Sequence, residues 1–286
     1  MSQTATPDII KIVKESLLKQ DNEPRTKNSF WATDSEKMAF DIYHAWIGTE
    51  PTNPMDTEKL MMFSSAKMIE LAYIEILKDS LVPPDPVLGQ HRIEIEREGV
   101  PITGYLDGLL TGNVPLEVKT FYGDYQEREL LAGKPKTSYL KQLGIYMDAK
   151  GADTGVLLYV NRGTGATYQF VLRKIRDRVY QMNDMIIDLN EVYKRWAKIY
   201  NENIVPRIEP DREGKMYKFP VQEVDWSKVP KAKIMAARNN HAVFGSWEIL
   251  YSPYKDLIVE REGTCLGYSL DELTFIKAAT AGYSTK

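Results

Sequence analysis

The chain has 286 residues, of which 43% are hydrophobic and 27% charged, the composition of a globular protein with a sizeable core. One cysteine, Cys265, excludes an internal disulfide framework and a cysteine-rich metal site. The formal net charge of −3 argues weakly against a protein that coats DNA, although an enzyme needs only a local basic cleft to bind nucleic acid. No apolar signal segment and no membrane-spanning stretch is evident, which favours a cytoplasmic protein without membrane contact.

Helices predominate in the first 80 residues of the predicted structure. Residues 8–20 have the spacing of a short amphipathic helix. A second helix, capped by Asp34 or Ser35, is expected to end at Gly48, because glycine readily terminates helices. A long helix over about 57–79 then ends before two consecutive prolines.

Strand patterns begin near residue 87. Three consecutive antiparallel strands are expected within 91–121, with turns at Gly99 and at 111–113. Further along, the pattern predicts a helix, a strand hairpin and a second long helix over residues 138–149, 155–173 and 175–203. This order predicts an α/β fold in which a mixed central sheet is flanked by helices.

Two acidic residues and a lysine fall on adjacent strands of the predicted meander. Glu117 and Lys119 share one face, because side chains alternate along a strand. A two-residue turn would pair Asp107 with Val118, on the wrong face, whereas a three-residue turn over 111–113 pairs Asp107 with Glu117. We expect the longer turn, which brings all three side chains together.

Two converging carboxylates suit a divalent cation, because Mg²⁺ and Mn²⁺ prefer oxygen ligands. A neighbouring lysine can orient a water molecule and stabilise charge on a phosphate. The alternative is a cross-strand charge pair on a solvated face. The apolar residues around Glu117 and Lys119 favour a buried site, where charged groups need partners.

The spacing of Asp107, Glu117 and Lys119 resembles the signature of the PD-(D/E)XK nuclease superfamily. Gln142 and Tyr146, four residues apart on the next predicted helix, resemble the Q-x-x-x-Y motif of its RecB-like exonuclease branch. The resemblance implies a restriction-endonuclease-like core with helical N- and C-terminal extensions. It also implies a nuclease activity that depends on Mg²⁺ or Mn²⁺.

Individual roles follow from the same resemblance. It implies that Asp107 and Glu117 bind metal, with the Val118 carbonyl as a further ligand, and that Lys119 assists catalysis. Gln142 and Tyr146 are then expected to line the active site or contact DNA. The alternative for this last pair is a helix-surface amide and a half-buried aromatic ring.

Glu70 is a further candidate metal ligand, because it lies within the apolar stripe of the helix over 57–79. A carboxylate in that position needs an ion pair, a hydrogen bond or a metal. Related nucleases carry a histidine or a glutamate in the corresponding helix, which implies a metal-site role. The alternative is an edge residue that reaches solvent or pairs with a lysine.

The C-terminal part resembles the iron–sulfur nucleases of the AddB and CRISPR-adaptation types, with the cluster cysteines absent. Ile249, Ser252 and Ile258 stand at the spacing of three cluster cysteines, and Met38 stands at the early position. These side chains cannot hold such a cluster, so no iron–sulfur cluster is expected. We expect Met38, Ile249 and Ile258 to pack together as an apolar staple between the two ends of the chain.

The resemblance therefore implies a single nuclease domain over 1–286. Residues 1–56 form an N-terminal helical extension, 57–205 form the core, and 206–286 form a C-terminal extension that packs back on the N-terminal part. A basic wall of a DNA groove, with aromatic rings, is expected from Lys134, Lys136, Lys141, Tyr125 and Tyr139. The alternative is that residues 123–137 form an ordinary polar loop.

The predicted function is that of a metal-dependent DNA exonuclease in recombination, repair or end resection, in the cytoplasm or, for a viral chain, the host cytoplasm. DNA is the expected partner, together with a recombinase or single-strand annealing protein, and the oligomeric state is left open. One alternative is a structure-specific or restriction-type endonuclease. Another is a non-catalytic DNA-binding module on a nuclease fold.

Overall fold

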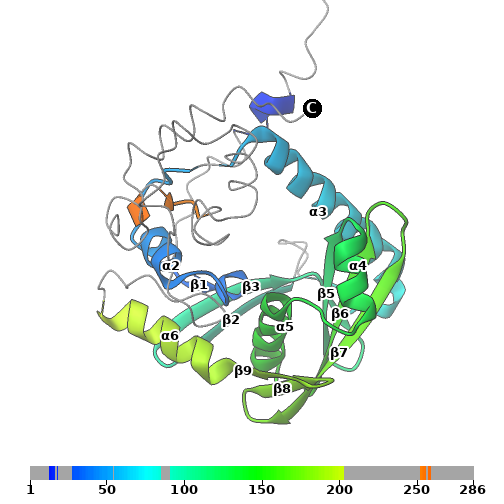
Figure 1. Ribbon diagram of the computed structural model, residues 1–286. Helices are drawn as coiled ribbons and strands as arrows, with labels where there is room; N and C mark the ends of the chain where they lie inside the picture. The colour runs from blue at the N-terminus through cyan, green and yellow to red at the C-terminus, as the bar shows by residue number, and fades with distance from the viewer. Residues whose placement is uncertain are drawn as a thin grey trace, which may run out of the picture. The chain divides into compact units, whose positions relative to one another are not determined.

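The computed structural model describes residues 13–16, 18, 28–53, 55–84, 91–202, 252–255 and 257–258 (Figure 1). The chain divides into two compact units, which are described separately. The first comprises Met1–Lys37 and Asp56–Asn203, and the second Met38–Met55 and Ile204–Lys286. None of the described helices is long and apolar enough to cross a membrane.

The first unit contains both strands and helices, in consecutive groups rather than in regular alternation. Its strands are β1 (Phe30–Trp31), β2 (His91–Arg97), β3 (Val100–Leu106), β4 (Gly108–Leu110), β5 (Val114–Phe121), β6 (Thr154–Asn161), β7 (Thr167–Arg176), β8 (Val179–Met182) and β9 (Met185–Asp188). Its α-helices are α3 (Thr57–Leu77), α4 (Asp124–Leu131), α5 (Thr137–Lys150) and α6 (Leu189–Glu202). Short 3-10 turns occupy Ala32–Asp34 and Lys78–Ser80.

The strands form two mixed sheets. Six strands are ordered β4-β5-β6-β7-β8-β9, with β5 and β6 parallel and all other neighbours antiparallel. Three strands are ordered β1-β3-β2, with β1 parallel to β3. The mixed α/β class is as predicted, but the expected single sheet is divided in two.

The division occurs at Asp107, between β3 and β4. Leu110 pairs with Val114 across the three-residue turn, so continuing the register places Asp107 opposite Glu117, as predicted. There the chain leaves the six-stranded sheet, and Asp107 Oδ2 accepts a hydrogen bond of 2.9 Å from the backbone N–H of Val118. The carboxylate thus takes the place of a strand carbonyl and satisfies a buried donor.

Helices α3 and α5 contact opposite faces of β5 (Figure 1). Leu116, Val118 and Val160 form a buried cluster, against which α3 packs with Ile69, Tyr73, Ile74 and Leu77. The alternate residues of β5 face α5, where Glu117 meets Gln142. Asp56 caps the start of α3 by accepting a hydrogen bond of 2.8 Å from the N–H of Lys59. The long helix was thus predicted correctly at its start.

The helix predicted over 175–203 is wrong in its first half. Strand β7 continues to Arg176 and is followed by the short strands β8 and β9, and only then does α6 begin at Leu189. Arg178 and Asn183 adopt left-handed backbone conformations, with φ of 56° and 52°, in the tight turns that reverse the chain. Strand β8, between these turns, has only four residues. So short a strand pattern is hidden in the sequence by the longer helical pattern that follows it.

Two smaller corrections concern helix boundaries. Residues 124–131 form α4 rather than a loop, and their acidic first turn suits a helix N-terminus. In the second unit, α2 (Ala39–Trp46) begins later than expected, because Asp34 belongs to the preceding 3-10 turn. Gly48, with φ of 75°, follows the end of α2 as predicted.

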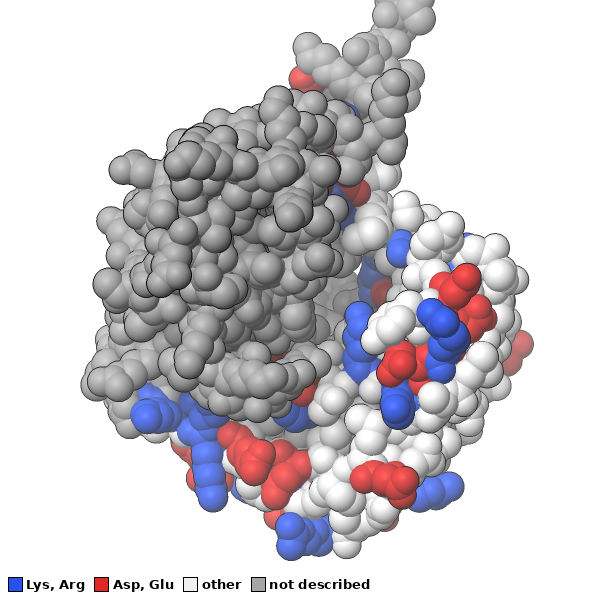
Figure 2. All heavy atoms as spheres, viewed as in Figure 1, with Lys and Arg blue, Asp and Glu red and all other residues white. Residues whose placement is uncertain are grey.

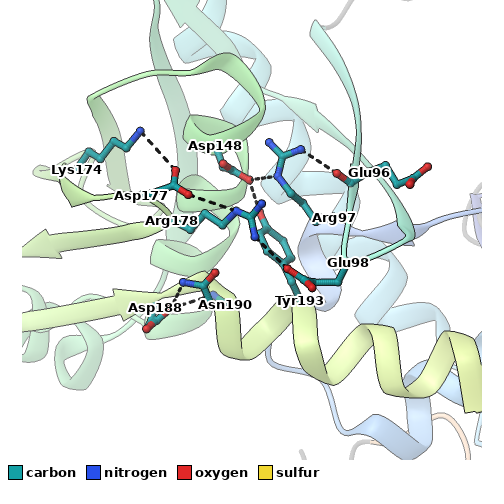
Figure 3. A network of polar contacts seen from close by, with 10 residues as sticks. All are labelled: Glu96, Arg97, Glu98, Asp148, Lys174, Asp177, Arg178, Asp188, Asn190 and Tyr193. Carbon is teal, nitrogen blue, oxygen red and sulfur yellow. Dashed lines mark hydrogen bonds and ion pairs between the residues drawn. The ribbon is translucent and has the colours of Figure 1, made fainter.

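A network of polar contacts, buried at Asp148 and Tyr193 and exposed at its edge, joins α5, α6 and the turns of the sheet (Figure 3). Asp148 at the end of α5 accepts hydrogen bonds from Arg97 Nε at 2.8 Å and from the Tyr193 hydroxyl at 2.9 Å. Burial and the Asp148 carboxylate raise the pKa of Tyr193 above its ordinary value, so its hydroxyl stays a donor. Arg178 adds an ion pair of 3.1 Å to Glu98. This network fixes α6 to the end of the sheet.

In the second unit, segments far apart in sequence meet around Ser252. Its hydroxyl donates to Asp41 Oδ1 at 2.6 Å and accepts from the N–H of Tyr254 at 3.0 Å. Met38 and Ile258 are both buried. Their packing against Ile249 stays a prediction, because Ile249 lies outside the described residues.

Candidate active site

The buried carboxylate of Glu117 is the centre of the candidate site. Its side chain is 1% exposed on the face of β5 that meets α5. Oε1 accepts a hydrogen bond of 2.7 Å from Gln142 Nε2 and an ion pair from Lys119 Nζ. Oε2 is buried and has no hydrogen-bond partner among the described residues. A buried carboxylate oxygen needs a hydrogen-bond partner or a cation, because leaving it unpaired destabilises the fold.

A second cluster of charged side chains consists of Asp107, at the end of β3, and Lys67 and Glu70 on α3. Lys67 Nζ is 3.5 Å from Asp107 Oδ1 and 3.7 Å from Glu70 Oε2, so one ammonium group bridges two carboxylates. Glu70 is 15% exposed, and its ion pair with Lys67 agrees with the alternative given above, in which Glu70 pairs with a lysine. Glu70 thereby reaches the neighbourhood of Asp107 from the opposite side of the strand from Gln142.

The charges of the site act on one another. Burial, followed by the charge of Asp107, raises the pKa of Glu117 to about 8. The same two causes raise the pKa of Glu70. Burial alone would lower the pKa of Lys119, but the Glu117 and Asp107 carboxylates outweigh it and raise that pKa. The site therefore holds a persistent ammonium beside a carboxyl group that resists ionisation.

Gln142 and Tyr146 lie on the buried face of α5 rather than at the helix surface. The Gln142 amide donates to Glu117 and also lies 2.8 Å from the Tyr146 hydroxyl. Burial and the charge of Glu117 raise the pKa of Tyr146, which keeps the hydroxyl protonated. With 1% of its surface exposed, Tyr146 supports the site from behind, and no face of its ring is open to DNA.

The backbone of β3 passes directly against the Tyr146 ring, and Gly104 makes this approach possible. A Cβ added at Gly104 would lie 2.7 Å from Tyr146 Cε1 and 3.1 Å from Ala32 Cβ. We expect Gly104→Ala to lower the free energy of unfolding by about 1–3 kcal/mol, as overpacking does. Urea denaturation would measure this. Gly144→Ala is the matched control, because its new Cβ would meet nothing closer than 3.5 Å.

Aromatic and basic side chains extend from Lys119 toward the surface. Lys119 Nζ lies 5.1 Å from the centre of the Tyr139 ring, and Lys136 Nζ lies 5.5 Å from the same ring. Such distances are typical of cation–π contacts. Elsewhere on the described surface, charges of both signs are interspersed in the view of Figure 2.

Sequence reasoning missed Lys67, although the signal was present. Lys67 precedes Glu70 by three residues on one helix, the spacing at which side chains meet. Its contact with Asp107 depends on how α3 crosses the sheet, which no local pattern encodes. Among the described residues, no group of three or more His, Cys, Asp or Glu side chains is positioned to hold a metal ion. Lysine ammonium groups contact these carboxylates instead.

No protein-family model and no curated protein sequence matches the chain. Among solved structures, one described as SSO0001 is 17% identical, with a TM-score of 0.45 over 71% of this chain and 90% of that chain. The alkaline exonuclease LHK-Exo of Laribacter hongkongensis is 12% identical, with a TM-score of 0.37 over 66% of this chain and 91% of its own. The structure of LHK-Exo in complex with dAMP is 13% identical, with a TM-score of 0.40 over 61% of this chain and 87% of that chain. With TM-scores below 0.5, these likenesses assign neither a family nor an activity to this chain.

Proposed function

We propose that the chain is a metal-dependent hydrolase of DNA phosphodiester bonds, and specifically an exonuclease related to the RecB-like branch of the PD-(D/E)XK superfamily. The observation that carries the proposal is the buried, unpaired Oε2 of Glu117 beside Asp107. A purely structural ion pair does not need a carboxyl group whose second oxygen is desolvated and unpaired.

The donors are carboxylate oxygens, the type that Mg²⁺ and Mn²⁺ prefer, although no three of them among the described residues are already positioned to hold a metal ion. Among the described residues, Glu117 Oε2 has no hydrogen-bond partner, and Asp107 Oδ1 and Glu70 Oε2 both form ion pairs with Lys67. These three carboxylates would hold the cation, with the Val118 carbonyl as a further ligand. A bound divalent cation lowers the pKa of a coordinated water and stabilises charge on a phosphate.

The protein's own groups divide the remaining work. Gln142 holds Oε1 of Glu117, which leaves Oε2 without a hydrogen-bond partner among the described residues. Burial and the charge of Asp107 raise the pKa of Glu117, so a divalent cation would bind more readily at higher pH, where the carboxyl group is ionised. Lys119 keeps its proton on Nζ and can orient the attacking water and donate to a phosphate oxygen.

Digestion of end-labelled linear DNA and closed circular DNA tests the proposal, with Mg²⁺, Mn²⁺ or EDTA. We expect linear DNA to be degraded only with a divalent cation, while circles remain intact. Cutting of circles would replace the exonuclease by the endonuclease alternative. Binding without cleavage under either metal would identify a DNA-binding module on a nuclease fold.

A further inference from the structure

Lys67 contacts two carboxylates of the candidate site, a position that could not be predicted from the sequence. It extends from α3, and its ammonium lies between Asp107 Oδ1 and Glu70 Oε2, at 3.5 and 3.7 Å. Both distances are longer than a close hydrogen bond, so the group is shared between the carboxylates rather than bound tightly to either. The side chain is 45% exposed and keeps a route to solvent.

The two lysines of the site differ in this respect. Lys119 is 18% exposed and contacts Glu117 and the Tyr139 ring, so it is held in place. Among the described residues, the ammonium of Lys67 has ion pairs with these two carboxylates. A cation that bound both carboxylates would therefore displace the Lys67 ammonium.

We propose that Lys67 is the site's resident counter-ion, which keeps Asp107 and Glu70 together in the metal-free protein and competes with the divalent metal for them. This inference rests on the proposed function. Without Lys67, the like charges of the two carboxylates would drive their side chains apart and weaken the metal-free site. With it, metal binding must first break two ion pairs, which lowers the apparent affinity.

Calorimetric titration with Mn²⁺ tests the inference. We expect Lys67→Met to bind Mn²⁺ roughly tenfold more tightly than wild type at low ionic strength, because a competing positive charge is removed. Added salt should narrow this difference. Lys59→Met is the matched control, since Lys59 lies on the same helix, is 43% exposed and pairs with Asp56 at 3.6 Å. That variant should bind Mn²⁺ as wild type does.

Thermal unfolding supplies a second readout. In EDTA, Lys67→Met should melt below wild type, and saturating Mn²⁺ should raise its melting temperature by more than it raises that of wild type. If Lys67 were only structural, its replacement would lower the melting temperature by the same amount in EDTA and in Mn²⁺. Equal or weaker Mn²⁺ binding by Lys67→Met, with wild type binding normally, would overturn the inference alone. If wild type and Asp107→Asn bind Mn²⁺ equally well, the proposed metal site fails, and the role of Lys67 fails with it.

Discussion

Glu117→Gln should abolish metal-dependent DNA cleavage, with a loss of roughly a thousandfold or more, while the protein still folds. Glutamine fills the same space and can still accept hydrogen bonds from Gln142 and Lys119, but it has no negative charge for a cation. Initial rates on end-labelled linear DNA would measure the loss. Glu94→Gln is the control, because Glu94 is 65% exposed on β2 and pairs with Arg92. A Glu117→Gln variant within tenfold of wild type would remove Glu117 from the active site.

Stability measured against pH gives the same variant an independent readout. The pKa of Glu117 is raised from an ordinary 4.5 to about 8, so the folded protein binds more protons than the unfolded chain between these values. The contribution of Glu117 to stability is therefore complete below pH 4.5 and is lost as the pH rises toward 8. Glu117→Gln lacks this loss. In EDTA, the difference in unfolding free energy should shift in favour of the variant from pH 5 to pH 8.5.

Asp148→Ala should have the largest effect on stability away from the site, a loss of about 3 kcal/mol of unfolding free energy. Asp148 is the common acceptor for Arg97 and Tyr193 (Figure 3), and its side chain is 9% exposed. Its removal leaves the buried hydroxyl of Tyr193 and the Nε of Arg97 without their acceptor, while the Arg97 guanidinium keeps its bond to the Glu96 carbonyl. Urea denaturation monitored by tryptophan fluorescence would measure the change.

Asp177 provides the comparison within the same network. It is 82% exposed and forms two long ion pairs, with Lys174 at 3.9 Å and with Arg178 at 3.8 Å. Exposed pairs contribute little, so Asp177→Ala should change the unfolding free energy by less than about 0.5 kcal/mol. Similar losses for the two variants would show that Asp148 does not anchor α6.

The sequence allowed the local geometry of the site to be predicted, because strand and helix periodicities are local properties. The alternation of β5 placed Glu117 and Lys119 together, and the three-residue turn put Asp107 opposite Glu117. The four-residue spacing of Gln142 and Tyr146 likewise placed them on one face of α5.

What could not be predicted depends on long-range packing or on short signals. Lys67 reaches Asp107 only because α3 crosses the sheet at one particular place. The strands β8 and β9 have four residues each and lack a strong period of their own. At Asp107 the sheet divides, and the Asp107 carboxylate accepts the hydrogen bond of the Val118 N–H in place of a backbone carbonyl. The residue type alone does not predict this role.

Asp107 and Glu117 differ in whether a related protein without catalytic activity would keep them. Asp107 caps the open edge of β5 through the Val118 N–H, so selection for a stable fold would preserve it even without catalysis. Glu117 has a desolvated oxygen without a partner among the described residues, and stability alone would favour its replacement by a neutral side chain. Under the proposed function, a glutamate at this position would therefore mark a chain that keeps its activity, whereas the aspartate would be kept for the fold as well.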